Sequence, residues 1–283
     1  MSRLTVHRYG PRLAAGGLPA GGSRAAAEPG HGPGRRPPVL AIHGVQGHGR
    51  RFRRLAQESL PEWTIVAPDL RGHGDSTWDP PWDAETHVGD LLGTLDAEGV
   101  DSFDVIGHSF GGLLAMRLAA AAPDRVRRLI LLDPAVGLPA ARMTAEAEAT
   151  RHDEGWASRA EALAARSADR PPQAIPDVLE DLDVHLAEGD DGRFRLRFSR
   201  PAVIVGWSEI AKAPVSLAGW SGPALVVIGD TGGYVMPGLL GALAADLGDR
   251  LTVRTIVSGH MVLWDAFEET AALIRGFLAD SAG

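Results

Sequence analysis

Short apolar runs alternate with longer amphipathic stretches along most of this chain. Continuous apolar runs predict strands buried on both faces, and they cover residues 39–42, 64–69, 103–106, 128–134, 223–229 and 251–257. Residues 4–9 alternate between apolar and polar positions and predict an edge strand. Helical patterns follow most of the runs, at residues 52–60, 85–98, 113–120 and 265–278. This alternation predicts an α/β fold with a mostly parallel central sheet flanked by helices.

Two stretches interrupt the alternation. Residues 1–37 hold the edge strand and a segment, 16–36, that is rich in Gly, Pro, Ala and Arg and has almost nothing to bury, so a flexible segment is expected there. Residues 138–213 contain helix-prone stretches and one short alternating run, but no buried strand. The core domain is therefore expected at residues 38–137 and 214–283, with 138–213 as an insertion.

Composition narrows the class of protein. A chain of 283 residues with 45% hydrophobic content can bury one large core. A formal net charge of −8 offers no basic face for nucleic acid, and the absence of cysteine excludes disulfides and thiolate catalysis. The chain has neither a signal-peptide pattern nor a run long enough for a membrane span, so we expect a cytoplasmic protein. The arginines clustered at residues 50–54 are interpreted as a solvated helix face.

A Gly-x-Ser-x-Gly motif, Gly107-His108-Ser109-Phe110-Gly111, stands between an expected strand and an expected helix. A sharp strand-to-helix turn strains the serine backbone, and flanking glycines let neighbouring chain pass close by. The serine oxygen is then exposed at the carboxyl end of the strand, beside the positive end of a helix. Other polar side chains follow strand ends and should share the same rim: His43, Asp69, Asp133, Asp230 and His260.

Four motifs in order carry a resemblance to a known family: residues 42–44 (Ile-His-Gly), 69–76 (Asp-Leu-Arg-Gly-His-Gly-Asp-Ser), 107–112 and 259–261 (Gly-His-Met). From Pro38 to about Leu278 the chain resembles the α/β-hydrolase fold family, in particular its cap-bearing serine hydrolases. The resemblance implies that residues 138–213 form a cap, or lid, and that motif 69–76 is architectural.

The resemblance also implies roles for two residues. Ser109 would be the nucleophile, and because a serine hydroxyl is a poor nucleophile at neutral pH it needs a base. His260 fits that base, since it lies in a Gly-His turn after the last strand and completes the family's order of nucleophile, acid and histidine.

The acid is not settled by the motifs. The family most often carries it at the position of Gly232, and glycine cannot serve. Asp133, at the end of an earlier strand, is favoured because some relatives carry their acid there. Asp230 is the alternative, and a dyad without a carboxylate is a third.

The remaining site features are implied by position. The family's oxyanion donors correspond to the backbone N–H groups of Val45 and Phe110. No cofactor is implied, and His43, His48 and His73 lack metal-ligand spacing. Several tryptophans are expected either to pack the cap on the core or to line an apolar acyl pocket: Trp78, Trp82, Trp156, Trp207 and Trp220.

The leading hypothesis is a serine hydrolase that cleaves a carboxylic ester, with lactones and thioesters as variants, through an acyl-enzyme. Its substrate would be a small molecule with an apolar acyl or ring portion. Carbon–carbon bond hydrolysis and cofactor-free haloperoxidase or perhydrolase activity use the same triad and stay open. A non-catalytic small-molecule-binding protein is the competing class; Gly232 favours it, and the presence of Ser109 with His260 argues against it.

Overall fold

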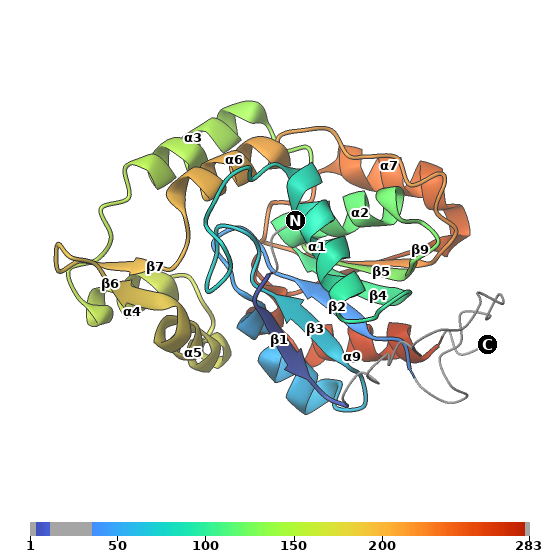
Figure 1. Cartoon of the computed structure of the whole chain (residues 1–283), viewed down its shortest axis with the longest axis horizontal. Coiled ribbons are helices and arrows are strands. Elements are labelled where there is room, and N and C mark those ends of the chain that lie inside the picture. The colour runs from blue at the N-terminus through green and yellow to red at the C-terminus, as the bar shows by residue number, and fades with distance from the viewer. Residues whose placement is uncertain (1–3, 12–35, 281–283) are drawn as a thin grey trace, which may run out of the picture.

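The computed structural model describes residues 4–11 and 36–280 and is organised around a seven-stranded sheet (Figure 1). The strand order is β1-β3-β2-β4-β5-β8-β9. The strands are β1 (Val6–Tyr9), β2 (Val39–Ile42), β3 (Ile65–Pro68), β4 (Phe103–His108), β5 (Val126–Leu132), β8 (Ala224–Gly229) and β9 (Leu251–Ile256). Only β1 pairs antiparallel with its neighbour, and the other neighbouring pairs are parallel. The expected α/β fold is confirmed.

Both faces of the sheet are apolar, which explains the continuous runs in the sequence. Successive residues of one strand enter opposite core clusters: Leu129 packs with the first cluster and Ile130 with the second. Each large apolar side chain buried in this way contributes roughly 1.5–3 kcal/mol. On one face lie α1 (Ala84–Ala97), α2 (Phe110–Ala121) and α7 (Pro237–Leu247), and on the other α9 (Phe267–Ala279) (Figure 1).

The chain between β5 and β8 leaves the sheet. Its elements are α3 (Ala140–Arg151), α4 (Arg159–Ser167), the 3-10 turn η3 (Pro172–Ala174), α5 (Ile175–His185), β6 (Leu186–Glu188), β7 (Phe194–Leu196) and α6 (Arg200–Ile210). Helices α3 and α6 lie side by side, while α4, α5 and the β6–β7 ribbon form a separate lobe at the left of the view (Figure 1). The helix-prone sequence in the first half of 138–213 thus forms two helices, α3 and α4, with a break between them.

Some elements differ from the sequence prediction. The helix expected at residues 52–60 is present, but its pitch changes along one continuous helical stretch: a 3-10 turn, η1 (Gly49–Phe52), is followed by residues 53–54 and a π-helical turn, η2 (Leu55–Ser59). The last helix is preceded by a separate short one, α8 (Val262–Asp265), and a further 3-10 turn, η4 (Gly248–Arg250), leads into β9. Helix α7 was not predicted, because Pro237 and two glycines obscure its pattern.

The expected flexible segment at 16–36 lies outside the described residues except for Arg36. Across the described ranges, no helix combines the length and apolar character that crossing a bilayer requires.

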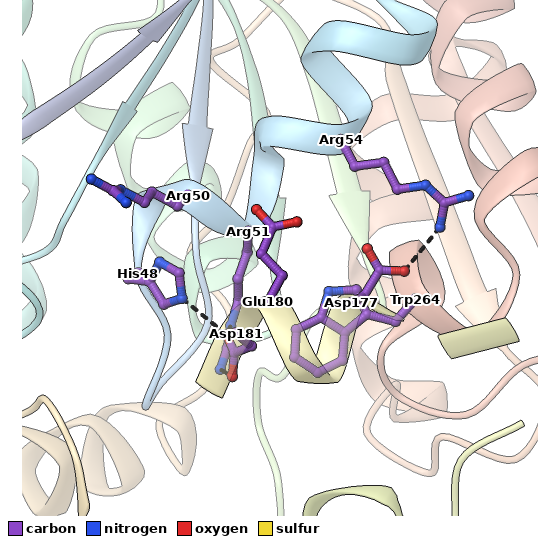
Figure 2. Close-up of a pocket in the computed structure, with 8 residues that line it drawn as sticks. All are labelled: His48, Arg50, Arg51, Arg54, Asp177, Glu180, Asp181 and Trp264. Atoms are coloured by element: carbon purple, nitrogen blue, oxygen red, sulfur yellow. Dashed lines mark hydrogen bonds and ion pairs between the residues drawn. The ribbon is translucent and has the colours of Figure 1, made fainter. Parts of the chain in front are cut away.

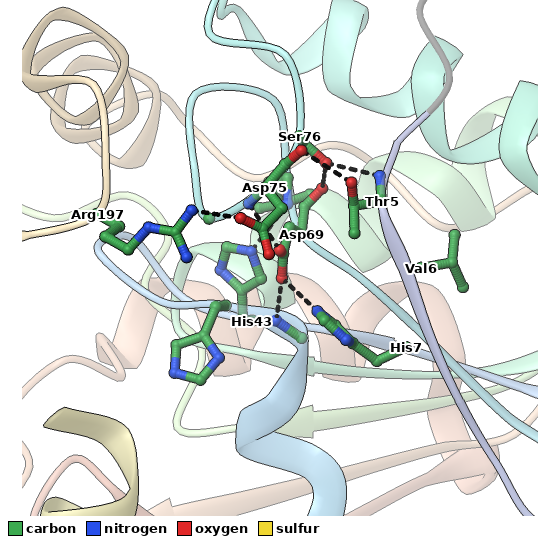
Figure 3. A network of polar contacts seen from close by, with 12 residues as sticks. Thr5, Val6, His7, His43, Asp69, Asp75, Ser76 and Arg197 are labelled. Carbon is green, nitrogen blue, oxygen red and sulfur yellow. Dashed lines mark hydrogen bonds and ion pairs between the residues drawn. The ribbon is translucent and has the colours of Figure 1, made fainter. Parts of the chain in front are cut away.

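Asp69 is the centre of a polar network that holds motif 69–76 in place (Figure 3). Its buried carboxylate accepts backbone N–H bonds from Gly49 (2.8 Å) and Asp75 (3.0 Å) and lies 3.0 Å from Nε2 of His7. Burial alone would raise the pKa of Asp69, but these bonds outweigh it and lower the pKa. Asp69 therefore joins β1, η1 and the motif together. Within residues 4–11 and 36–280 the carboxylate of Asp69 makes no hydrogen bond to Ser109 or His260, so Asp69 braces another part of the rim.

Candidate active site

Ser109 occupies the sharp turn between β4 and α2. Its backbone has φ 56° and ψ −119°, a strained conformation that recurs at functional sites. A Cβ on Gly107 would lie 2.2 Å from the carbonyl oxygen of Gly111, and a Cβ on Gly111 would lie 2.1 Å from that of Ile42. Only glycine fits at these two positions, so the motif spacing has a direct steric cause.

His260 lies between Ser109 and Asp133. Its Nε2 is 2.9 Å from Oγ of Ser109, and its Nδ1 is 2.6 Å from Oδ2 of Asp133. The three side chains come from the end of β4, the end of β5 and the turn after β9, which meet at the carboxyl edge of the parallel sheet. The Asp133 side chain is fully buried, whereas 22% of the His260 side chain is exposed.

The carboxylate of Asp133 is fixed by the backbone. Its Oδ1 accepts the N–H of Gly229 at 3.0 Å, which leaves Oδ2 for the imidazole. Asp133 also has a positive φ, 41°. Burial raises the pKa of Asp133 to about 6, against the effect of the Gly229 bond. Two bonds and a constrained backbone therefore hold this carboxylate against His260.

Neither Gly232 nor Asp230 holds the imidazole of His260 in the structure. A Cβ built on Gly232 would lie 2.5 Å from Oδ2 of Asp133, so the Asp133 carboxylate takes the space that a side chain at 232 would need. Asp230 accepts the backbone N–H of Ser258 at 3.0 Å and thus braces the turn that precedes His260. Of the two candidate acids, the structure brings only Asp133 to the imidazole.

The two expected oxyanion donors, Val45 and Phe110, belong to chain segments next to Ser109. Phe110 is the first residue of α2, and the loop from His43 to Val45 lies against Ser109, since a Cβ on Gly44 would be 3.0 Å from the serine Cβ. Within the described residues neither N–H donates a hydrogen bond. Both N–H groups are therefore unpaired in this part of the structure.

The imidazole of His260 is kept uncharged by its surroundings. Burial lowers its pKa, and the guanidinium groups of Arg170, Arg142 and Arg51 lower it further. Its backbone carbonyl lies 2.9 Å from Nε2 of His108, whose pKa burial lowers to about 3. A neutral imidazole is the form that can accept a proton from a hydroxyl.

The interpretation of the clustered arginines as a solvated face is wrong for Arg51. Its side chain is 8% exposed, and its guanidinium donates two bonds to Asp181 of α5, at 2.7 Å from Nε and 3.0 Å from Nη2. His48 lies 2.9 Å from the same carboxylate (Figure 2). Arg50 and Arg53 are exposed, and Arg50 points away from this group (Figure 2). The cluster therefore ties η1 to α5, across 130 residues of sequence.

A small cavity beside Gly44 and His108 is lined mainly by apolar side chains: Phe52, Met261, Leu263 and Trp264. Trp264 was not singled out in the sequence. Trp207 joins α6 to α3, because its Nε1 donates a hydrogen bond to Oγ1 of Thr150. Nε1 of Trp220 donates a hydrogen bond to the backbone carbonyl of Val126, which lies at the end of β5 away from Asp133.

Comparison with known proteins assigns the chain to a protein family. Residues 37–267 match the model of the alpha/beta hydrolase fold. The chain belongs to the α/β-hydrolase fold family. As expected of an α/β hydrolase, it is similar to structures with the same sheet: E-2-(acetamidomethylene)succinate hydrolase superposes with a TM-score of 0.78 at 19% identity, over 98% of this chain and 95% of the other.

Curated relatives of this α/β hydrolase include lipases and esterases. The chain is 41% identical over 277 residues to lipase LipV of Mycobacterium tuberculosis, covering 97% of both chains. It is 29% identical over 255 residues to esterase YbfF of Escherichia coli, covering 86% of this chain and 93% of the relative.

Proposed function

We propose that this α/β hydrolase is a serine hydrolase that cleaves a carboxylic ester through an acyl-enzyme. The observation that carries the proposal is the bridge that His260 makes between Oγ of Ser109 and Oδ2 of Asp133. The lipase and esterase relatives support the ester class.

In this mechanism Ser109 attacks the ester carbonyl while Nε2 of His260 takes its proton. Asp133 accepts a hydrogen bond from Nδ1–H of His260, which holds the tautomer with a free Nε2 and stabilises the imidazolium that forms. The N–H groups of Val45 and Phe110 donate to the developing oxyanion. His260 then returns the proton to the leaving alcohol. Water hydrolyses the acyl-enzyme with the same histidine as base.

Residues 138–213 act as a cap in this proposal. Helix α6 packs on the loop that carries Val45, because Gly206 approaches the Val45 side chain. The ion pairs from η1 to α5 tie the lobe formed by α4, α5 and the β6–β7 ribbon to the core, beside the apolar cavity. A substrate with an apolar acyl or ring portion suits this lining, and a cap over it would exclude water from the reaction.

The test is hydrolysis of p-nitrophenyl esters from acetate to long acyl chains, together with labelling by a fluorophosphonate probe. We expect turnover of at least one ester, and a covalent adduct that peptide mass spectrometry maps to Ser109. A folded protein that hydrolyses no ester and takes up no probe contradicts the proposal.

The pH dependence of kcat/KM follows from the lowered pKa of His260. Only the neutral imidazole accepts the serine proton, and a pKa below the ordinary 6.5 keeps it neutral as the pH falls past that value. We expect a plateau near neutral pH and an acid limb below pH 6.5. The limb belongs to the coupled His260–Asp133 pair. An acid limb centred above pH 7, in a buffer series at constant ionic strength, contradicts this assignment.

Gly232→Ala is expected to lower kcat by about 100-fold, because a displacement of the catalytic groups by about 1 Å has this effect. The added methyl would meet Oδ2 of Asp133 at 2.5 Å and push the carboxylate from His260. The matched control is Gly238→Ala, whose Cβ meets nothing within 4 Å. Steady-state kinetics of both variants decide the point, and equal kcat values would show that the space at 232 is unimportant.

A further inference from the structure

Tyr234, in the loop between β8 and α7, lies directly on the imidazole of His260. The two ring centroids are 3.8 Å apart and the planes differ by 23°, which is a stacked arrangement. A second ring, that of His108, meets the same imidazole at 4.8 Å with a tilt of 41°. None of the four sequence motifs includes Tyr234.

The other face of the Tyr234 ring is covered by Arg142 of α3. The guanidinium carbon is 4.2 Å from the ring centroid, and Nη1 donates to the carbonyl oxygen of Gly233 at 2.7 Å. Two groups that both lie about 4 Å above one ring centre must take opposite faces. The order is therefore Arg142, Tyr234, His260, and the stack links α3 to the site.

This arrangement leaves little of the tyrosine for a substrate. With both ring faces occupied, only the ring edge and the hydroxyl can contact a bound molecule, so the ring is poorly placed to act as a pocket wall. Its face does restrict the tilt of the imidazole. The Asp133 bond holds only Nδ1, and a ring free to tilt about that bond would move Nε2 off Oγ of Ser109.

We propose that Tyr234 is a positioning residue for the general base His260 and that Arg142 holds the Tyr234 ring in place. This inference rests on the proposed function, because it assumes that His260 is the base. The groups that face His260 come from several elements: Asp133, Ser109, His108, Tyr234, Arg142, Arg51 and Arg170. Among them, Tyr234 alone stacks on the imidazole without a hydrogen bond to it.

The experiment compares Tyr234→Phe with Tyr234→Leu. Phenylalanine keeps the stacked face, so its kcat should stay within about twofold of wild type, whereas leucine should lower kcat about tenfold with KM nearly unchanged. The loss should be the same for p-nitrophenyl acetate and butyrate, and the rate of fluorophosphonate labelling should fall by the same factor. A wild-type kcat in Tyr234→Leu overturns the inference. So does a loss confined to KM that varies with acyl length, because it would identify a pocket wall.

Arg142→Gln provides an independent test, with Arg151→Gln on the same helix as its control. Arg151 is exposed, and among the residues that the structure describes it pairs only with Glu148. Removing the guanidinium of Arg142 from the face of the Tyr234 ring should lower kcat several-fold relative to the Arg151→Gln variant. Losing its positive charge should also move the acid limb of kcat/KM to higher pH. If Tyr234→Leu does not fold, this arm decides, and equal kcat values for the two arginine variants overturn the inference.

The two proposals fail differently. If the folded wild type hydrolyses no ester and does not react with the fluorophosphonate, the proposed function fails. If the wild type reacts and the Tyr234 and Arg142 variants match their controls, only the positioning role fails.

Discussion

Ser109→Ala is expected to lower kcat for ester hydrolysis by about 10⁴-fold or more, because the nucleophile of every turnover is removed. The fold should survive the change. Alanine keeps the Cβ that already fits this position, so the strain at φ 56° is no greater than with serine, and only the bond from Oγ to His260 is lost. Steady-state kinetics on p-nitrophenyl butyrate, with thermal melting of both proteins, measure the two effects.

A second variant, His260→Ala, tests whether Ser109 and His260 act as a cooperating pair. His260→Ala should cost a similar factor, and the double variant should be scarcely worse than either single one, because residues that act as a unit give non-additive losses. Independent, multiplying losses would indicate that the two side chains serve different steps. Hydrolysis that persists in Ser109→Ala would place the nucleophile elsewhere. The binding-protein alternative would be favoured instead by a wild type that retains esters without turning them over.

The elements and the position of Ser109 at a sharp strand-to-helix turn could be predicted because their signals are local. The strand runs are apolar on both faces, and the glycines at 107 and 111 stand where any Cβ would collide with backbone. The acid could be narrowed only to two aspartates. What separates them is a bond between distant segments, from Asp230 to the turn before His260, which no pattern in the neighbouring residues encodes.

Arg51 and Tyr234 also had no sequence signal, because their contacts join segments that are distant in the chain. Arg51 resembles its exposed neighbours until Asp181 is placed against it by the packing of α5 on η1. Tyr234 lies next to two glycines in an irregular loop, and its partners His260 and Arg142 are far from it in the chain. Such contacts depend on the relative placement of whole elements, so they follow from the fold and not from periodicity.

Asp133→Asn is expected to lower kcat by about 10⁴-fold, as when a triad aspartate is neutralised. The asparagine oxygen can keep the bond from the Gly229 N–H, which would leave its NH₂ group facing Nδ1 of His260. Two donors cannot share that contact, so the imidazole would hold its proton on Nε2 and lose the lone pair that Ser109 needs. The geometry would be preserved while the tautomer is wrong. Steady-state kinetics on p-nitrophenyl butyrate, at and above neutral pH, measure the loss.

The matched control is Asp230→Asn. In the described part of the chain its Oδ1 accepts only the backbone N–H of Ser258, a bond that an amide oxygen can also make. We expect kcat to stay within about tenfold of wild type, because one neutral bond replaces a charge-assisted one. The reverse pattern, with Asp133→Asn active and Asp230→Asn impaired, would transfer the role of the acid to Asp230 through a rearranged loop. Full activity in both variants would leave Ser109 and His260 working as a dyad. Either outcome would also mean that the space beside Gly232, which the carboxylate of Asp133 occupies, is not needed for catalysis.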